Sequence, residues 1–98
     1  MSTADVFPPA APQGLRGIVS AGRVELVWEP NSEIDLQGYN VYRSGALEGT
    51  FQKISASPAV VNSWSDAPPA RGPFFYRVTG VDRKGNESAR SAPVGVDF

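Results

Sequence analysis

The chain is a succession of short segments in which apolar and polar residues alternate, with turns containing glycine or proline between them. In Arg23–Glu29, Val24, Leu26 and Trp28 fall on one face and charged residues dominate the other. A period of two is typical of a half-buried antiparallel strand, because successive side chains of a strand point to opposite faces. No segment keeps a helical period for more than one turn. The pattern therefore predicts an all-β fold.

Seven segments of this kind follow one another along the chain. They are Leu15–Val19, Arg23–Glu29, Gly38–Ser44, Phe51–Ile54, Ala59–Trp64, Phe74–Val81 and Pro93–Phe98. Short strands with turn signals about every 8 to 12 residues indicate a β-sandwich. Residues 1–11 are small and rich in proline, which favours a flexible linker, so we expect the domain to cover residues 12–98.

Composition excludes several classes of function. The sequence contains no cysteine and no histidine, so it lacks the usual ligands of structural zinc and the Ser–His or Cys–His pair of a nucleophilic enzyme. Its net charge of −1 predicts no nucleic-acid partner. No apolar run approaches the about 18 residues of a membrane span, and no calcium-loop or phosphate-loop motif is present. We therefore expect no catalytic residues, no cofactor, no metal and no membrane insertion.

The order and spacing of five motifs resemble a fibronectin type III domain of the bacterial kind. They are Pro12-x-x-Leu15, Val24-x-Leu26-x-Trp28, Gly38-Tyr39-Asn40-Val41-Tyr42-Arg43, the run from Phe74 to Asp82, and Gly85-Asn86-Glu87-Ser88. The resemblance implies an immunoglobulin-like β-sandwich of seven antiparallel strands in two sheets. It places the first, second and fifth strands in one sheet and four strands in the other. Its implied core consists of Trp28, Tyr39, Val41, Tyr76 and Val78.

The corner before the sixth strand departs from the family. Members usually start that strand with a tyrosine whose hydroxyl bonds back to the preceding connection, and the residue that corresponds here is Phe74. The connection usually carries a leucine that packs inward, and Ala67-Pro68-Pro69 has no equivalent. We expect the rigidity of the prolines to take over part of this role.

A candidate interaction face lies on the outer side of the larger sheet. If Phe74 and Tyr76 point inward, alternation turns their neighbours outward, next to the outward residues of the third strand. The resulting face consists of Asn40, Tyr42, Phe75, Arg77 and Val81. Exposed aromatics with an arginine are typical of interface cores. Alternatively, strands accept aromatics on either face and the stem of Arg77 merely covers them.

The resemblance also implies a role. In bacteria, such domains recur in exported glycan-degrading enzymes and surface proteins. We expect a monomeric, non-catalytic module of a larger extracytoplasmic protein that acts as a spacer or docks on neighbouring domains or another protein. The alternative is an accessory domain that binds polysaccharide, with Trp64 as a stacking platform. Trp28 fits a core position, and Trp64 is also expected to pack inward, because tryptophan is mostly buried.

Overall fold

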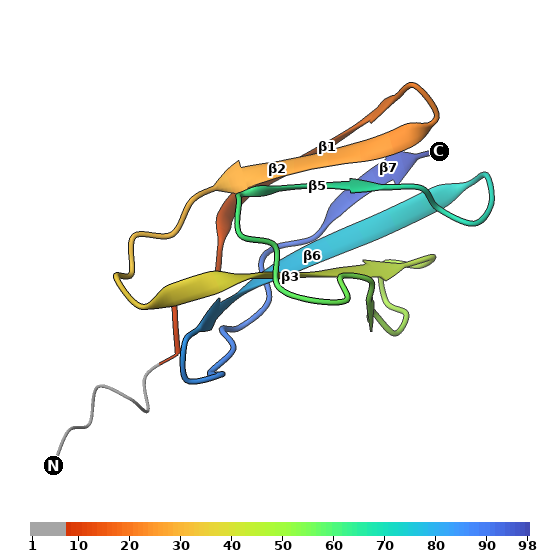
Figure 1. The fold of residues 1–98 in the computed structure, drawn as a ribbon. Coiled ribbons are helices and arrows are strands. Elements are labelled where there is room, and N and C mark those ends of the chain that lie inside the picture. Colours follow the sequence, from red (N-terminus) through yellow and green to blue (C-terminus); the bar gives the residue numbers. More distant parts are fainter. Residues whose placement is uncertain (1–7) are drawn as a thin grey trace, which may run out of the picture.

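The computed structural model describes residues 8–98, so residues 1–7 of the predicted linker lie outside it. It is built of antiparallel strands joined by turns and loops (Figure 1). The strands are β1 (Gln13–Ser20), β2 (Arg23–Glu29), β3 (Leu36–Ser44), β4 (Gln52–Lys53), β5 (Ser63–Asp66), β6 (Pro73–Asp82) and β7 (Val94–Asp97). The predicted all-β fold of seven strands is confirmed. Residues 8–98 contain no helix that is both long and apolar enough to cross a membrane.

Two sheets face each other across one core. The order is β1-β2-β5 in the three-stranded sheet and β4-β3-β6-β7 in the four-stranded sheet, and every neighbouring pair is antiparallel. This is the arrangement that the resemblance implied. The strand β6 pairs with β3 along most of its length and with β7 at its start, so it is a central strand of the larger sheet.

The core contains the residues that the resemblance implied. Trp28, Tyr39, Val41, Tyr76 and Val78 are all at most 2% exposed. The rings of Trp28 and Tyr39 meet edge to face with centroids 5.2 Å apart, a favoured geometry for aromatic pairs. Trp64 is half-buried and packs against this cluster, as predicted for a core residue. The parity inferred from the sequence is therefore confirmed.

The segment predicted as one strand over Ala59–Trp64 is divided between the two sheets. Ala59 pairs with Tyr39 of β3, through bonds of 2.9 and 2.8 Å in the two directions. Only four residues later does β5 begin, at Ser63, and pair with β2. The predicted single strand was wrong because the chain crosses from one layer to the other here.

Buried serine hydroxyls accept hydrogen bonds from backbone N–H groups of the inner strands. Ser55 accepts from Val41 at 3.0 Å, and Ser91 accepts from Val78 at 2.9 Å. Since a buried N–H without a partner costs free energy, these hydroxyls stabilise strands at positions where no neighbouring strand supplies a carbonyl.

Ser91→Ala is expected to lower the free energy of unfolding by about 1–2 kcal/mol, because it leaves the buried Val78 N–H without its acceptor. Urea unfolding followed by tryptophan fluorescence measures the loss. Ser57→Ala, at an exposed position, is the matched control and should change stability by less than about 0.5 kcal/mol. Equal effects of the two variants would contradict the role assigned to Ser91.

A buried polar cluster joins the two sheets. Asp66, the last residue of β5, accepts hydrogen bonds from Arg43 of β3 at 3.0 and 2.9 Å and from the hydroxyl of Tyr76 of β6 at 2.6 Å. The guanidinium of Arg43 also lies 5.8 Å from the centroid of the Phe74 ring. Asp66 is 8% exposed, so these bonds form in a largely dry environment.

This cluster corrects the expectation for the corner before β6. The hydroxyl that bonds back to the preceding segment belongs to Tyr76, two residues after Phe74, and its acceptor is a carboxylate. Pro68 of the connection is buried, so an apolar residue does occupy the corner although no leucine is present.

Stability is expected to fall at alkaline pH because of Tyr76. Burial raises the pKa of its hydroxyl, and the bond to Asp66 raises it further. A tyrosine in the unfolded chain ionises near about pH 10, whereas the folded chain holds the proton to higher pH. The contribution of Tyr76 to the free energy of unfolding is therefore complete below about pH 10 and is lost as the pH rises above that value. Tyr42, whose pKa burial and Glu87 also raise, acts in the same direction.

Urea unfolding at a series of pH values from neutral to strongly alkaline tests this. The free energy of unfolding should decline above about pH 10, and the decline should be shallower in Tyr76→Phe, which keeps only the contribution of Tyr42. An identical decline in the variant would show that Tyr76 is not its source.

Candidate interaction surfaces

The candidate interaction face is more covered than its sequence indicated. Asn40 and Val81 are each only 8% exposed, so the expectation that they stand open to solvent was wrong. Tyr42, Phe75 and Arg77 are half-buried. Alternation did turn these side chains away from the core, but other parts of the chain fold over them.

Glu87, which follows the turn after β6, covers one part of this face. Its carboxylate accepts hydrogen bonds from Asn40 at 3.3 Å, from Thr79 at 2.5 Å and from the hydroxyl of Tyr42. Partial burial acts to raise the pKa of Glu87, but the bonds from Thr79, Tyr42 and Asn40 outweigh it and lower the pKa. The polar groups of the face are therefore paired within the chain.

Arg90 and Phe51, which lie outside the face, each cover one of its side chains. Arg90 lies 4.6 Å from the centroid of the Tyr42 ring, and Arg77 lies 5.2 Å from that of Phe51. Both distances suit a cation–π contact. The ring of Phe75 packs over Gly95, where a Cβ atom would come within 2.8 Å of it. Sequence analysis missed the covering residues Phe51, Glu87 and Arg90, because local alternation cannot indicate which distant segment folds over a sheet.

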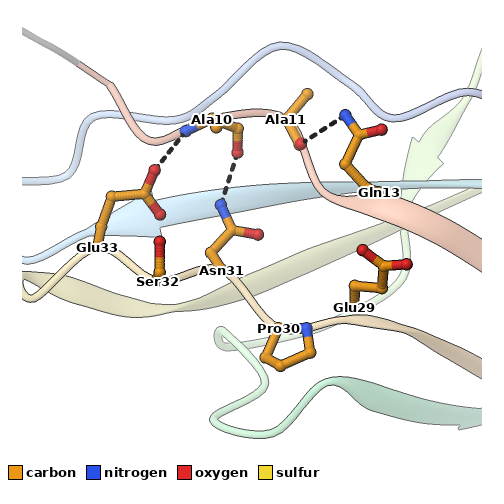
Figure 2. A pocket seen from close by; sticks show the side chains of 8 residues that line it. All are labelled: Ala10, Ala11, Gln13, Glu29, Pro30, Asn31, Ser32 and Glu33. Carbon is orange, nitrogen blue, oxygen red and sulfur yellow. Dashed lines mark hydrogen bonds between the residues drawn. The ribbon is translucent and has the colours of Figure 1, made fainter.

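The chain enters the sandwich beside the loop between β2 and β3. Figure 2 shows a shallow hollow there, of about 150 Å³, between Ala10, Ala11 and Gln13 on one side and the loop residues on the other. Glu33 accepts a bond from the Ala10 N–H at 2.9 Å, and Asn31 donates to the Ala10 carbonyl at 2.7 Å. The Ala10 N–H is also the main cause that lowers the pKa of Glu33. Ala10, in the predicted linker, is thus bonded to the domain through both its N–H and its carbonyl group.

The hollow offers little to a metal ion. Two carboxylates, Glu29 and Glu33, line it, and nowhere in residues 8–98 do three His, Cys, Asp or Glu side chains gather in a way that could hold a metal. The entry site is therefore better understood as an attachment of the chain to the loop.

The last residue, Phe98, is bound at the other end of the sandwich. Its N–H donates to the Gly72 carbonyl at 2.8 Å, and its carbonyl accepts from the Gly72 N–H at 3.4 Å. The guanidinium of Arg71 lies 5.7 Å from the centroid of its ring. Gly72 precedes the start of β6, whereas the loop that holds Ala10 lies beside the end of β6, where Leu36 pairs with Asp82. Entry and exit are therefore at opposite ends (Figure 1).

The outer side of the three-stranded sheet carries a second exposed surface, which sequence analysis did not single out. Ile18 of β1 is 64% exposed and Val27 of β2 is 40% exposed. With Arg16 and Glu25 they surround a hollow of about 300 Å³. We call these four residues the β1–β2 face. The sequence predicted the strand that contains Ile18, but it did not indicate that this side chain is part of an exposed surface.

Comparison with known proteins supports the fold. No family model matches the chain. An amylopullulanase from Thermoanaerobacter thermohydrosulfuricus is 31% identical over 87 residues, which are 87% of this chain and 6% of that protein. The structure of an Fn3-like protein from Clostridium thermocellum superposes with a TM-score of 0.80 at 25% identity, covering 94% of this chain and 95% of the other.

A segment of a larger enzyme is similar as well. The β-1,2-glucanase from Parabacteroides distasonis matches with a TM-score of 0.75 and 27% identity over 91% of this chain and 12% of the glucanase. The chain thus spans a small fraction of the length of the amylopullulanase and of the glucanase, and nearly all of the Fn3-like protein. Its strand order, its core and these similarities agree: the chain is a fibronectin type III-like β-sandwich domain.

Proposed function

We propose that this domain is a non-catalytic accessory module of a larger exported bacterial protein, in which it holds neighbouring domains at a fixed separation. The observation that carries the proposal is that Ala10 and Phe98 are attached to the domain at opposite ends of the sandwich. Ala10 is bonded to the β2–β3 loop, and Phe98 is bonded to Gly72. A spacer needs such attachments because a rigid body joined through loose ends would not fix a distance.

The length of the spacer follows from β6, which runs between the two ends. At about 3.3 Å per residue, its ten residues span roughly 33 Å. The similarity to segments of an amylopullulanase and a glucanase supports a place beside other domains in an extracytoplasmic chain.

The alternative of a polysaccharide-binding domain has less support. A sugar platform requires an exposed aromatic ring, but Trp28 is 2% exposed and Trp64 packs against the core. Arg90 covers the ring of Tyr42. Docking through the candidate interaction face also has less support, because other parts of the chain cover it. Only Tyr42, Phe75 and Arg77 of this face are still partly exposed to solvent.

Distance measurement between the two ends tests the spacer. The chain has no cysteine, so Ala10→Cys with Asp97→Cys allows two spin labels at defined positions. We expect one narrow distance distribution. Adding Glu33→Ala should broaden it, because the Ala10 N–H loses its acceptor, whereas Glu48→Ala in the exposed β3–β4 loop should not. A broad distribution with Glu33 intact would contradict a fixed spacer.

Titration with a panel of soluble and insoluble polysaccharides tests the alternative. As a spacer, the domain should show no change in tryptophan fluorescence and no retardation in polysaccharide-containing gels. Retardation accompanied by an emission shift that Trp64→Phe abolishes would instead support carbohydrate binding.

A further inference from the structure

We propose that the β1–β2 face binds the same face of a second copy of this chain, in a weak two-fold dimer. This goes beyond the proposed spacer role. The face combines two exposed apolar side chains, Ile18 and Val27, with two charged ones, Arg16 and Glu25, around one hollow.

The register of the hairpin sets the arrangement of the four side chains. Arg16 pairs with Val27, and Ile18 pairs with Glu25. In an antiparallel pair, directly opposed residues project from the same face, so the four form the corners of a rectangle. The charged residues occupy one diagonal and the apolar residues the other.

Neither charged side chain of this face forms a salt bridge within residues 8–98. In the described part of the chain, the side chain of Arg16 makes no hydrogen bond or ion pair, and the sole salt bridge joins Arg43 and Asp66. Glu25 accepts a hydrogen bond from the hydroxyl of Ser65 at 2.9 Å. The same hydroxyl accepts a bond from Arg23 at 2.6 Å, so Arg23 lies near Glu25 but makes no salt bridge with it. An arginine and a carboxylate on one diagonal are thus available to a partner of complementary charge.

The diagonal pattern is complementary to itself in one orientation. If a second copy is laid face to face with a two-fold axis along the Ile18–Val27 diagonal, Arg16 of each copy meets Glu25 of the other. Ile18 then lies on Ile18 and Val27 on Val27. An axis along the other diagonal would oppose like charges, and axes parallel to the edges would place charged groups on apolar ones.

The favoured orientation crosses the strands of the two copies at nearly a right angle, a known mode of sheet packing. On the neighbouring strand β5, Ser63 and Ser65 pair with Val27 and Glu25 and have short side chains. The longer side chain of Arg23 lies against Ser65, at the edge of the face. The hollow at the centre, beside the Gly17–Leu26 pair, leaves room for the apolar side chains of the second copy.

The contact is small. Four side chains and the flanking serines are far fewer than the about 20–30 residues per partner of a stable interface. Association should therefore be weak, with a dissociation constant of about 1 mM. In dilute solution the chain should then be the monomer that the sequence analysis expected. Domains held close together by a shared chain or surface reach effective concentrations in the millimolar range, at which such a contact becomes occupied.

Sedimentation equilibrium of the 98-residue chain from about 50 µM to 2 mM tests the dimer. Arg16→Glu and Glu25→Arg should each weaken association about tenfold or more, because each opposes like charges across the axis. An equimolar mixture of the two variants should associate again, as should the double variant, because opposite charges then meet. Arg83→Glu, in the exposed turn after β6, is the matched control and should leave association unchanged.

Ile18→Ser provides a variant without charge change and should also weaken association about tenfold. Thermal unfolding midpoints close to that of the unaltered chain would show that each variant is folded. A monomer at about 2 mM would overturn the proposal. Association that persists in both charge reversals, or that the mixture fails to restore, would overturn it too, since the contact would then involve another surface.

Discussion

Asp66→Ala is expected to reduce the free energy of unfolding by about 2–4 kcal/mol. The variant removes the acceptor shared by Arg43 and Tyr76. The side chain of Arg43 is 23% exposed, so its charge would remain without a partner and only partly hydrated. The hydroxyl of Tyr76, in a residue with no exposed surface, would lose its acceptor as well. Guanidinium unfolding followed by tryptophan fluorescence measures the loss.

Two further variants separate this effect from a general loss of charge. Asp97→Ala removes a carboxylate from an exposed position of β7 and should change stability by less than about 0.5 kcal/mol. Asp66→Asn keeps an acceptor for Tyr76 but not the negative charge, so its loss should lie between those of the two alanine variants. If Asp66→Ala and Asp97→Ala had the same effect, the cluster would not be what joins the sheets.

Gly38→Ala is expected to destabilise the domain by about 2–3 kcal/mol, the upper part of the range for overpacking a core. A Cβ atom at this position of β3 would come within 2.5 Å of the Ala59 carbonyl oxygen and 2.9 Å of the Pro58 Cβ. The nearest atom belongs to the backbone, which cannot rotate away like the end of a side chain. The displaced segment would also weaken the pairing of Tyr39 with Ala59.

Gly45→Ala is the matched control, because a Cβ atom at Gly45 would meet nothing within 4 Å. It should be neutral, or slightly stabilising because alanine restricts the unfolded chain. Chemical unfolding of both variants checks the comparison. A neutral Gly38→Ala would mean that the segment around Ala59 does not lie firmly against β3.

The local alternation of apolar and polar residues was sufficient to predict the core, but not the contacts at the corner before β6. Trp28 and Val41 could be assigned inward because each belongs to a strand with a clear alternation. The partner of the Tyr76 hydroxyl could not be assigned, since Asp66 lies ten residues earlier, across a turn, in the other sheet.

The candidate interaction face shows the same limit on the outer side of the sheet. Alternation predicted that Tyr42 and Arg77 point away from the core, and both do. Their exposure depends on Glu87, Arg90 and Phe51, which reach them from outside β3 and β6. The alternation of apolar and polar residues along a strand indicates toward which face of the sheet each side chain points. It contains no information about segments that later fold over that side.

The amino-acid sequence alone determined most of the strands, their inward faces and the resemblance to a family, because these depend on neighbours within a few residues and on the burial of apolar side chains. Only the tertiary structure decided which outward side chains remain in solvent, where Ala10 and Phe98 are attached, and that Asp66 joins the sheets. These features arise from contacts between residues far apart in the chain, such as Tyr42 and Glu87, 45 positions apart. Their geometry exists only once the two sheets have packed.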